Sequence, residues 1–165
     1  SKQSRGLGDV YKRQHLNWLN RLFRPESDTP QYSEHDLHRA AAALLFEVAR
    51  TDGTVDQAET QRLIAAVEQH WHLDAEEMQD IVAELENRVD QATDLFEFTL
   101  PLRDHWGPEQ RVTLIDEMWA MAAADGKADV HEEHLIRRVS DLLYVSHGDY
   151  IRAKLKATDP QALDT

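Results

Sequence analysis

The chain has 165 residues, a length typical of one domain, with 41% apolar residues, 30% charged residues and no cysteine. The absence of cysteine excludes disulfides, thiolate zinc sites and cysteine nucleophiles, and no run of 18 apolar residues is present that could span a bilayer. The net charge of −13 predicts a surface that repels phosphate backbones and attracts cations or basic proteins, so we expect no nucleic-acid partner.

Residues 1–14 differ from the rest of the chain in charge and in pattern. They hold four basic residues against Asp9, a net charge of +3, which leaves −16 for residues 15–165. They show no helical period, and we interpret them as a non-native or disordered extension, either a cloning remnant or an upstream translated artefact.

Residues 15–30 are predicted to form a short amphipathic helix followed by a polar linker between Pro25 and Pro30. We favour packing of this helix on the domain, with weak contact to an anionic membrane surface as the alternative. Its apolar stripe, with the basic residues that flank it, comprises Leu16, Trp18, Leu19, Leu22 and Phe23 with Arg21 and Arg24.

Seven further helices are predicted from apolar residues at helical spacing and from capping or breaking residues at their ends. Ser33 with Asp36 has the spacing of a capping box, and Gly107-Pro108 marks a clean break. We expect Pro101 to kink or end the fifth of these helices, because proline lacks the N–H that a helix interior uses. The helices are expected at about residues 33–50, 56–71, 74–85, 93–102, 108–121, 129–143 and 146–155.

No segment shows the alternation of a strand, so the predicted class is all-α, a bundle of about seven to eight helices. The residues after the last helix, 159–165, are expected to form a disordered tail.

The chain contains an internal repeat. Val48–Glu59 and Met121–Glu132 match at a shift of 73 residues and share the pattern Ala-x-x-Asp-Gly-x-[Val/Ala]-Asp-x-x-Glu between two helices. For each turn taken singly, ordinary helix-hairpin chemistry is a sufficient explanation. The glycine ends one helix, the second Asp caps the next, and the Glu returns the hydrogen bond of a capping box.

The two turns together suggest a shared cation site. Carboxylates that lie close together are costly without a cation or proton between them, and hard oxygen ligands suit Ca²⁺ or Mg²⁺ better than Zn²⁺. An EF-hand is excluded, because its first ligand position would fall on Val48 or Met121. We therefore take a divalent cation as the candidate cofactor, on the condition that the two turns fold toward each other. The candidate ligands are Asp52, Asp56, Glu59, Asp125, Asp129 and Glu132, and the candidate turn residues are Gly53 and Gly126.

At these residues the sequence resembles the TerB-like family, which is associated with bacterial tellurite resistance and is also found as the N-terminal domain of DjlA membrane co-chaperones. The resemblance covers roughly Leu37 to Leu155 and is carried by the two Asp-Gly hairpins, the acidic helices around residues 74–90 and Pro108-Glu109. It implies a pseudo-two-fold helical domain over residues 31–158, with an acidic surface that binds divalent cations within membrane-linked stress-response complexes.

The resemblance also implies a protein partner and a cytoplasmic location, peripheral to the inner membrane where that partner is membrane-associated. Stimulation of a chaperone by this chain alone is not expected, because His147-Gly148-Asp149 lacks the proline of the His-Pro-Asp motif of a J domain. The expected function is a non-enzymatic acidic module, and the alternative is a DjlA-like scaffold without a metal site.

Histidines offer weaker candidates. His131-Glu132-Glu133-His134 is not a zinc-protease motif, because its histidines are three rather than four residues apart, and no nucleophile with an obvious base occurs. His131 or His134 joining the carboxylates around a transition metal stays an alternative. The other paired histidines are expected to be exposed helix residues rather than ligands: His35, His38, His70 and His72.

Overall fold

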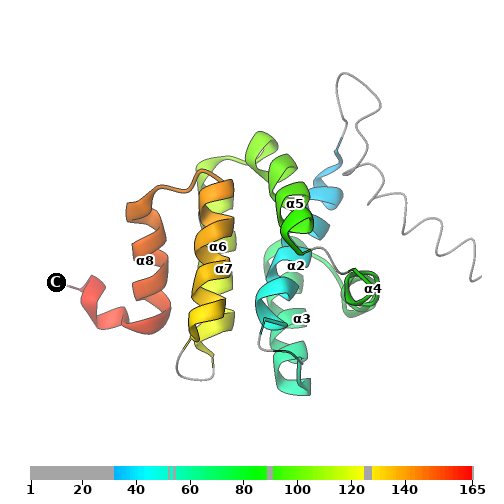
Figure 1. Ribbon diagram of the computed structural model, residues 1–165, viewed down its shortest axis with the longest axis horizontal. Coiled ribbons are helices and arrows are strands. Elements are labelled where there is room, and N and C mark those ends of the chain that lie inside the picture. The colour runs from blue at the N-terminus through cyan, green and yellow to red at the C-terminus, as the bar shows by residue number, and fades with distance from the viewer. Residues whose placement is uncertain (1–31, 52, 54, 89–90, 125–127, 165) are drawn as a thin grey trace, which may run out of the picture.

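The computed structural model describes residues 32–51, 53, 55–88, 91–124 and 128–164. This part of the chain forms seven α-helices and one short 3₁₀ helix with no strand, which confirms the all-α prediction (Figure 1). The predicted helix within residues 15–24, and the extension before it, lie outside the described residues. The helices are α2 (Glu34–Ala49), α3 (Gln57–Trp71), α4 (Ala75–Glu86), α5 (Gln91–His105), α6 (Pro108–Ala123), α7 (Val130–Leu142), α8 (His147–Thr158) and the 3₁₀ helix η1 (Pro160–Leu163).

Helix α2 is the centre of the bundle, in contact with α3, α4, α5, α6 and α7. Its residues from Ala40 to Ala49 are all buried, because this stretch is apolar apart from Glu47 and a helix with apolar residues all round is stable only when it is covered on every side. The four successive alanines, Ala40–Ala43, are small enough to let neighbouring backbones approach closely. None of the described helices is long and apolar enough to cross a membrane.

The internal repeat is larger than the two matching turns. Helices α2, α3 and α4 correspond in order to α6, α7 and α8, and α5 joins the two halves. The third helix of each half is placed differently: α4 is seen end-on in Figure 1, whereas α8 lies in the plane of the view beside α6. The N-cap residues show the correspondence at shifts of 74, 73 and 72 residues, with Ser33, Asp56 and Asp74 matching Gly107, Asp129 and Ser146.

The predicted helix starts are confirmed where the capping residues identify them. Ser33 Oγ accepts a hydrogen bond from the Asp36 N–H at 3.1 Å, and the Ser33 N–H donates to Asp36 Oδ2 at 3.3 Å, the reciprocal pair of a capping box. Pro108 is the first residue of α6, with Gly107 as its N-cap.

Two helix ends differ from the sequence prediction. Pro101 was expected to kink or end its helix, and α5 does not end there but continues to His105. A proline inside a helix costs about 3 kcal/mol, and burial of Leu102 and Trp106 beyond it offsets that cost. The predicted disordered tail over 159–165 also differs from the structure, because Pro160–Leu163 forms η1 and contacts α8.

Candidate site at the paired Asp-Gly turns

The helices that flank the two Asp-Gly turns in the sequence meet at the same end of the bundle. Helices α2 and α6 end there, and α3 and α7 begin there, at the lower end of the view in Figure 1. The candidate residues Asp52, Asp125 and Gly126 lie outside the described residues, so the positions of these two carboxylates are not described.

The first turn shows why its glycine is needed. Gly53 has φ +116°, a backbone conformation that residues with a side chain rarely adopt, and its N–H donates to the Arg50 carbonyl oxygen at 3.0 Å. Asp56 is the N-cap of α3, and its Oδ1 accepts from the Glu59 N–H at 2.7 Å. Glu59 therefore lies in the first turn of α3, where it is half-buried.

The second turn ends in a complete capping box. Asp129 Oδ1 accepts from the Glu132 N–H at 2.8 Å, and the Asp129 N–H donates to Glu132 Oε1 at 3.2 Å. The capping interpretation of Asp56, Asp129 and Glu132 is thus confirmed. Capping leaves ligand capacity, because an ionised carboxylate offers about four lone-pair sites and each of these hydrogen bonds uses one.

The described candidate ligands are not arranged as a metal site by themselves. In the part of the chain that the structure describes, no group of three or more His, Asp or Glu side chains could hold a metal ion. His131 and His134 are both exposed on α7.

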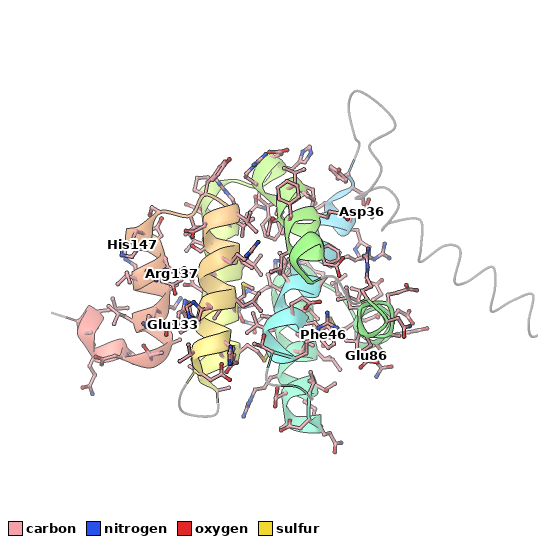
Figure 2. The ribbon with its side chains drawn as sticks, in the orientation of Figure 1. Asp36, Phe46, Glu86, Glu133, Arg137 and His147 are labelled. Carbon is pink, nitrogen blue, oxygen red and sulfur yellow. The ribbon has the colours of Figure 1, made fainter. Side chains whose placement is uncertain are left out.

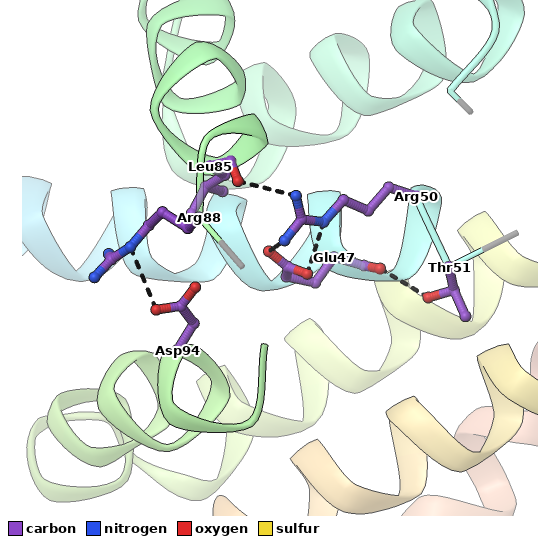
Figure 3. A network of polar contacts seen from close by, with 6 residues as sticks. All are labelled: Glu47, Arg50, Thr51, Leu85, Arg88 and Asp94. Carbon is purple, nitrogen blue, oxygen red and sulfur yellow. Dashed lines mark hydrogen bonds and ion pairs between the residues drawn. The ribbon is translucent and has the colours of Figure 1, made fainter. Parts of the chain in front are cut away.

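A buried ion pair beside the first turn was missed by the sequence analysis (Figure 3). Glu47 is 0% exposed, and its carboxylate accepts two hydrogen bonds from the Arg50 guanidinium, at 2.9 and 2.6 Å. Arg50 also donates to the carbonyl oxygen of Leu85 at 2.9 Å, and Thr51 Oγ1 donates to the carbonyl oxygen of Glu47 at 2.8 Å. This network ties the end of α2, where the turn begins, to the end of α4.

Arg88 and Asp94 extend the polar contacts toward α5, with Arg88 Nε 3.4 Å from Asp94 Oδ1 (Figure 3).

The signal for Glu47 was present in the sequence. A carboxylate within an otherwise apolar helix stretch must be buried, and a buried charge needs a partner such as the arginine three residues later.

The prediction that four paired histidines are exposed was wrong for His38 and His70, whose side chains are 13% and 28% exposed. Because α2 packs against α3 and α6, His38 lines a polar hollow of about 240 Å³ together with His70 and His72. His70 Nε2 lies 2.8 Å from Glu117 Oε1, an ion pair between α3 and α6 when the imidazole is protonated.

Burial lowers the pKa of His38 below 6.5. Glu34 and a hydrogen bond to the Trp71 backbone act in the opposite direction, and the neighbouring imidazoles of His35 and His72 lower the pKa further.

A family model described as Tellurite resistance protein TerB matches residues 38–155 of the chain. The match includes both Asp-Gly turns and most of each half of the repeat. The sequence matches no curated protein and no solved structure.

Proposed function

Because this chain belongs to the TerB family over residues 38–155, we propose that it is a non-catalytic acidic module that binds a divalent cation and mediates protein–protein interactions in a bacterial stress response of the tellurite-resistance type. The observation that supports the cation is the common end of the bundle at which α2 and α6 end and α3 and α7 begin (Figure 1). Ca²⁺ or Mg²⁺ fits carboxylate oxygens best.

Helix dipoles distinguish two kinds of carboxylate at this end. Asp56 and Asp129 cap helices, and the positive end of the helix dipole already stabilises their charge. In sequence, Asp52 and Asp125 follow the carboxyl ends of α2 and α6, where the dipole is negative and an added carboxylate is unfavourable. A divalent cation would offset this repulsion, so we expect Asp52 and Asp125 to carry most of the affinity.

Calorimetric titration of Ca²⁺, Mg²⁺, Mn²⁺ and Zn²⁺ tests the proposal. We expect saturable binding by the wild type and at least about tenfold weaker binding by Asp52→Asn/Asp125→Asn, since a loss of about 1.4 kcal/mol is tenfold in affinity. The matched control is Asp74→Asn/Asp149→Asn, which also removes two negative charges, at positions outside the Asp-Gly turns, and should bind like the wild type. Equal heats in all three proteins would remove the shared cation site.

A second candidate is a scaffold of the DjlA N-terminal type without a metal site. The observation that favours it is the hydrogen bonding of Asp56, Asp129 and Glu132, which all act as caps. We expect a basic partner, because residues 15–165 carry a charge of −16. The resemblance to the DjlA N-terminal domain favours a partner associated with the inner membrane. Pull-down from a native membrane fraction separates the two candidates. A scaffold keeps its partner in EDTA and in the Asp52→Asn/Asp125→Asn variant, and a cation-dependent module loses it in both.

A further inference from the structure

The first half of the repeat contains an apolar groove between α2, α3 and α4. Its floor and walls include Phe46, Ile64, Met78 and Val82, and Thr60 and Glu86 lie at its polar edge. The groove has a volume of about 130 Å³, close to the roughly 150 Å³ of an engineered cavity that admits benzene. It therefore accommodates one large apolar side chain rather than a cofactor-sized molecule.

The second half closes the corresponding position with its own side chains. Trp119 corresponds to Phe46 and Tyr150 to Met78, and their rings meet edge to face with centroids 5.9 Å apart. Lys154 corresponds to Val82, and its Nζ lies 5.6 Å from the centroid of the Trp119 ring.

Two more charged side chains help to fill this position in the second half. We call the group of five side chains the plug: Trp119, Glu133, Arg137, Tyr150 and Lys154. Glu133, which corresponds to Thr60, pairs with Lys154 Nζ at 2.6 Å, and Arg137, which corresponds to Ile64, lies 5.7 Å from the centroid of the Tyr150 ring. In Figure 2, Glu133 and Arg137 lie on the side of α7 that faces α8, whereas Phe46 and Glu86 lie on the α4 side of α2. Smaller and uncharged residues at the matching positions leave the groove of the first half open.

Residues 15–24 of the same chain have the chemistry that this groove would accept. At 100° per residue, the five apolar side chains from Leu16 to Phe23 fall within one arc of about 160°, and Asn17, Asn20, Arg21 and Arg24 occupy the opposite arc. Trp18 or Phe23 supplies an aromatic ring to fill the hollow. The arginines complement Glu86, the carboxylate of α4 that lines the groove.

The connection is long enough. Seven residues, 25–31, separate Arg24 from Tyr32, which packs on the His105 ring, and can span about 23–25 Å when extended. Phe46 lies thirteen residues along the chain from Ser33, a rise of about 20 Å in a helix. The linker can therefore return the segment to the groove.

We propose that residues 15–24 dock as an amphipathic helix in the groove between α2, α3 and α4, with Trp18 or Phe23 as the anchor, in the place that the second half fills with Trp119, Glu133 and Lys154. The groove lies next to the first Asp-Gly turn, because Val55 of that turn lines it, but none of the proposed carboxylate ligands is among its lining residues.

Cross-linking in the full chain tests the docking, because the wild type has no cysteine. A short bis-maleimide should join Asn20→Cys on the segment to Gln79→Cys at the groove within one molecule. The matched control joins Asn20→Cys to Arg152→Cys, an exposed position on α8 in the other half, and its yield should be about tenfold lower. Equal intramolecular yields would overturn the proposal. Cross-links only between molecules would assign the groove to a second copy.

Transfer of the plug gives an independent test. Thr60→Glu/Val82→Lys introduces the counterparts of Glu133 and Lys154 into the first half and should lower the Asn20–Gln79 cross-link about tenfold. Trp18→Ala/Phe23→Ala should lower it equally and alters only the segment, so the test holds even if the plug variant fails to fold. An undiminished yield in the segment variant contradicts the proposal. Capture of the segment by anionic vesicles, with loss of the cross-link, would assign it to a membrane surface instead.

Discussion

Glu47 and Arg50 form the ion pair on which the start of the first Asp-Gly turn depends. Removing one partner of a buried pair leaves an uncompensated charge and typically costs about 3–5 kcal/mol. We predict a loss of this size for Arg50→Met, measured by urea unfolding. Glu47→Leu/Arg50→Met should recover most of it, because a buried pair often can be replaced by apolar side chains.

The control for that series is the exposed pair of Glu133 and Lys154, in which the Glu133 side chain is 41% exposed. Glu133→Gln should cost less than about 1 kcal/mol. If Arg50→Met cost no more than Glu133→Gln, the buried pair would not stabilise the turn.

His38 couples stability to pH. Its pKa is lowered in the folded protein, mainly by burial, so the unfolded chain binds the proton first as the pH falls. The neutral imidazole therefore stabilises the fold above pH 6.5, and this contribution is lost as the pH falls through 6.5 toward the folded pKa. We predict that unfolding free energy falls less between pH 7.5 and pH 5.5 in His38→Gln than in the wild type. Parallel pH profiles for the two proteins would contradict this.

At the scale of the helix, two substitutions of Asp129 distinguish the effect of its capping hydrogen bond from the effect of its charge. Asn caps a helix about as well as Asp, whereas Ala costs about 0.5–2 kcal/mol. We predict that Asp129→Ala lowers the unfolding free energy by about 1 kcal/mol and that Asp129→Asn leaves it within a few tenths. Urea unfolding measures both. Equal destabilisation by the two substitutions would show that the charge, rather than the cap, holds α7 in place.

Helix starts were predictable because capping chemistry is local. Ser33, Asp56, Asp74, Asp129 and Ser146 each identify a start from a few neighbouring residues, and the structure confirms them as N-caps. Helix ends were less predictable. Pro101 opposes the helix locally, but burial of residues distant in sequence decides the outcome. The left-handed residues His72 and Tyr144, which follow α3 and α7, are not glycine or asparagine and gave no signal.

The candidate site was predictable in its residues but not in its arrangement. Pattern matching found the caps Asp56 and Asp129 and the glycine of the first turn. It could not show that Glu47 and Arg50 anchor that turn to α4, because the partner carbonyl of Leu85 is 35 residues from Arg50. The hollow around His38 was missed for the same reason, since α2, α3 and α6 all contribute to it.

At the scale of the whole molecule, the excess of negative charge opposes compaction. A net charge of −13 on one domain gives repulsion that salt screens, since the Debye length falls from about 30 Å at 0.01 M to about 8 Å at 0.15 M. We predict that NaCl raises the melting temperature over this range in every variant. Thermal unfolding followed by circular dichroism measures the effect.

A bound cation stabilises the folded state beyond the effect of charge screening. At matched ionic strength, CaCl₂ or MgCl₂ should raise the melting temperature of the wild type beyond NaCl, because a ligand at a hundred times its Kd stabilises the folded state by about 2.7 kcal/mol. Asp52→Asn/Asp125→Asn should lose this excess and keep the response to NaCl, whereas Asp74→Asn/Asp149→Asn should keep both. If the divalent salts raised the melting temperature of the wild type no more than NaCl does, the carboxylates of the two Asp-Gly turns would act only through their charge. Screening alone would then account for the effect of salt on stability.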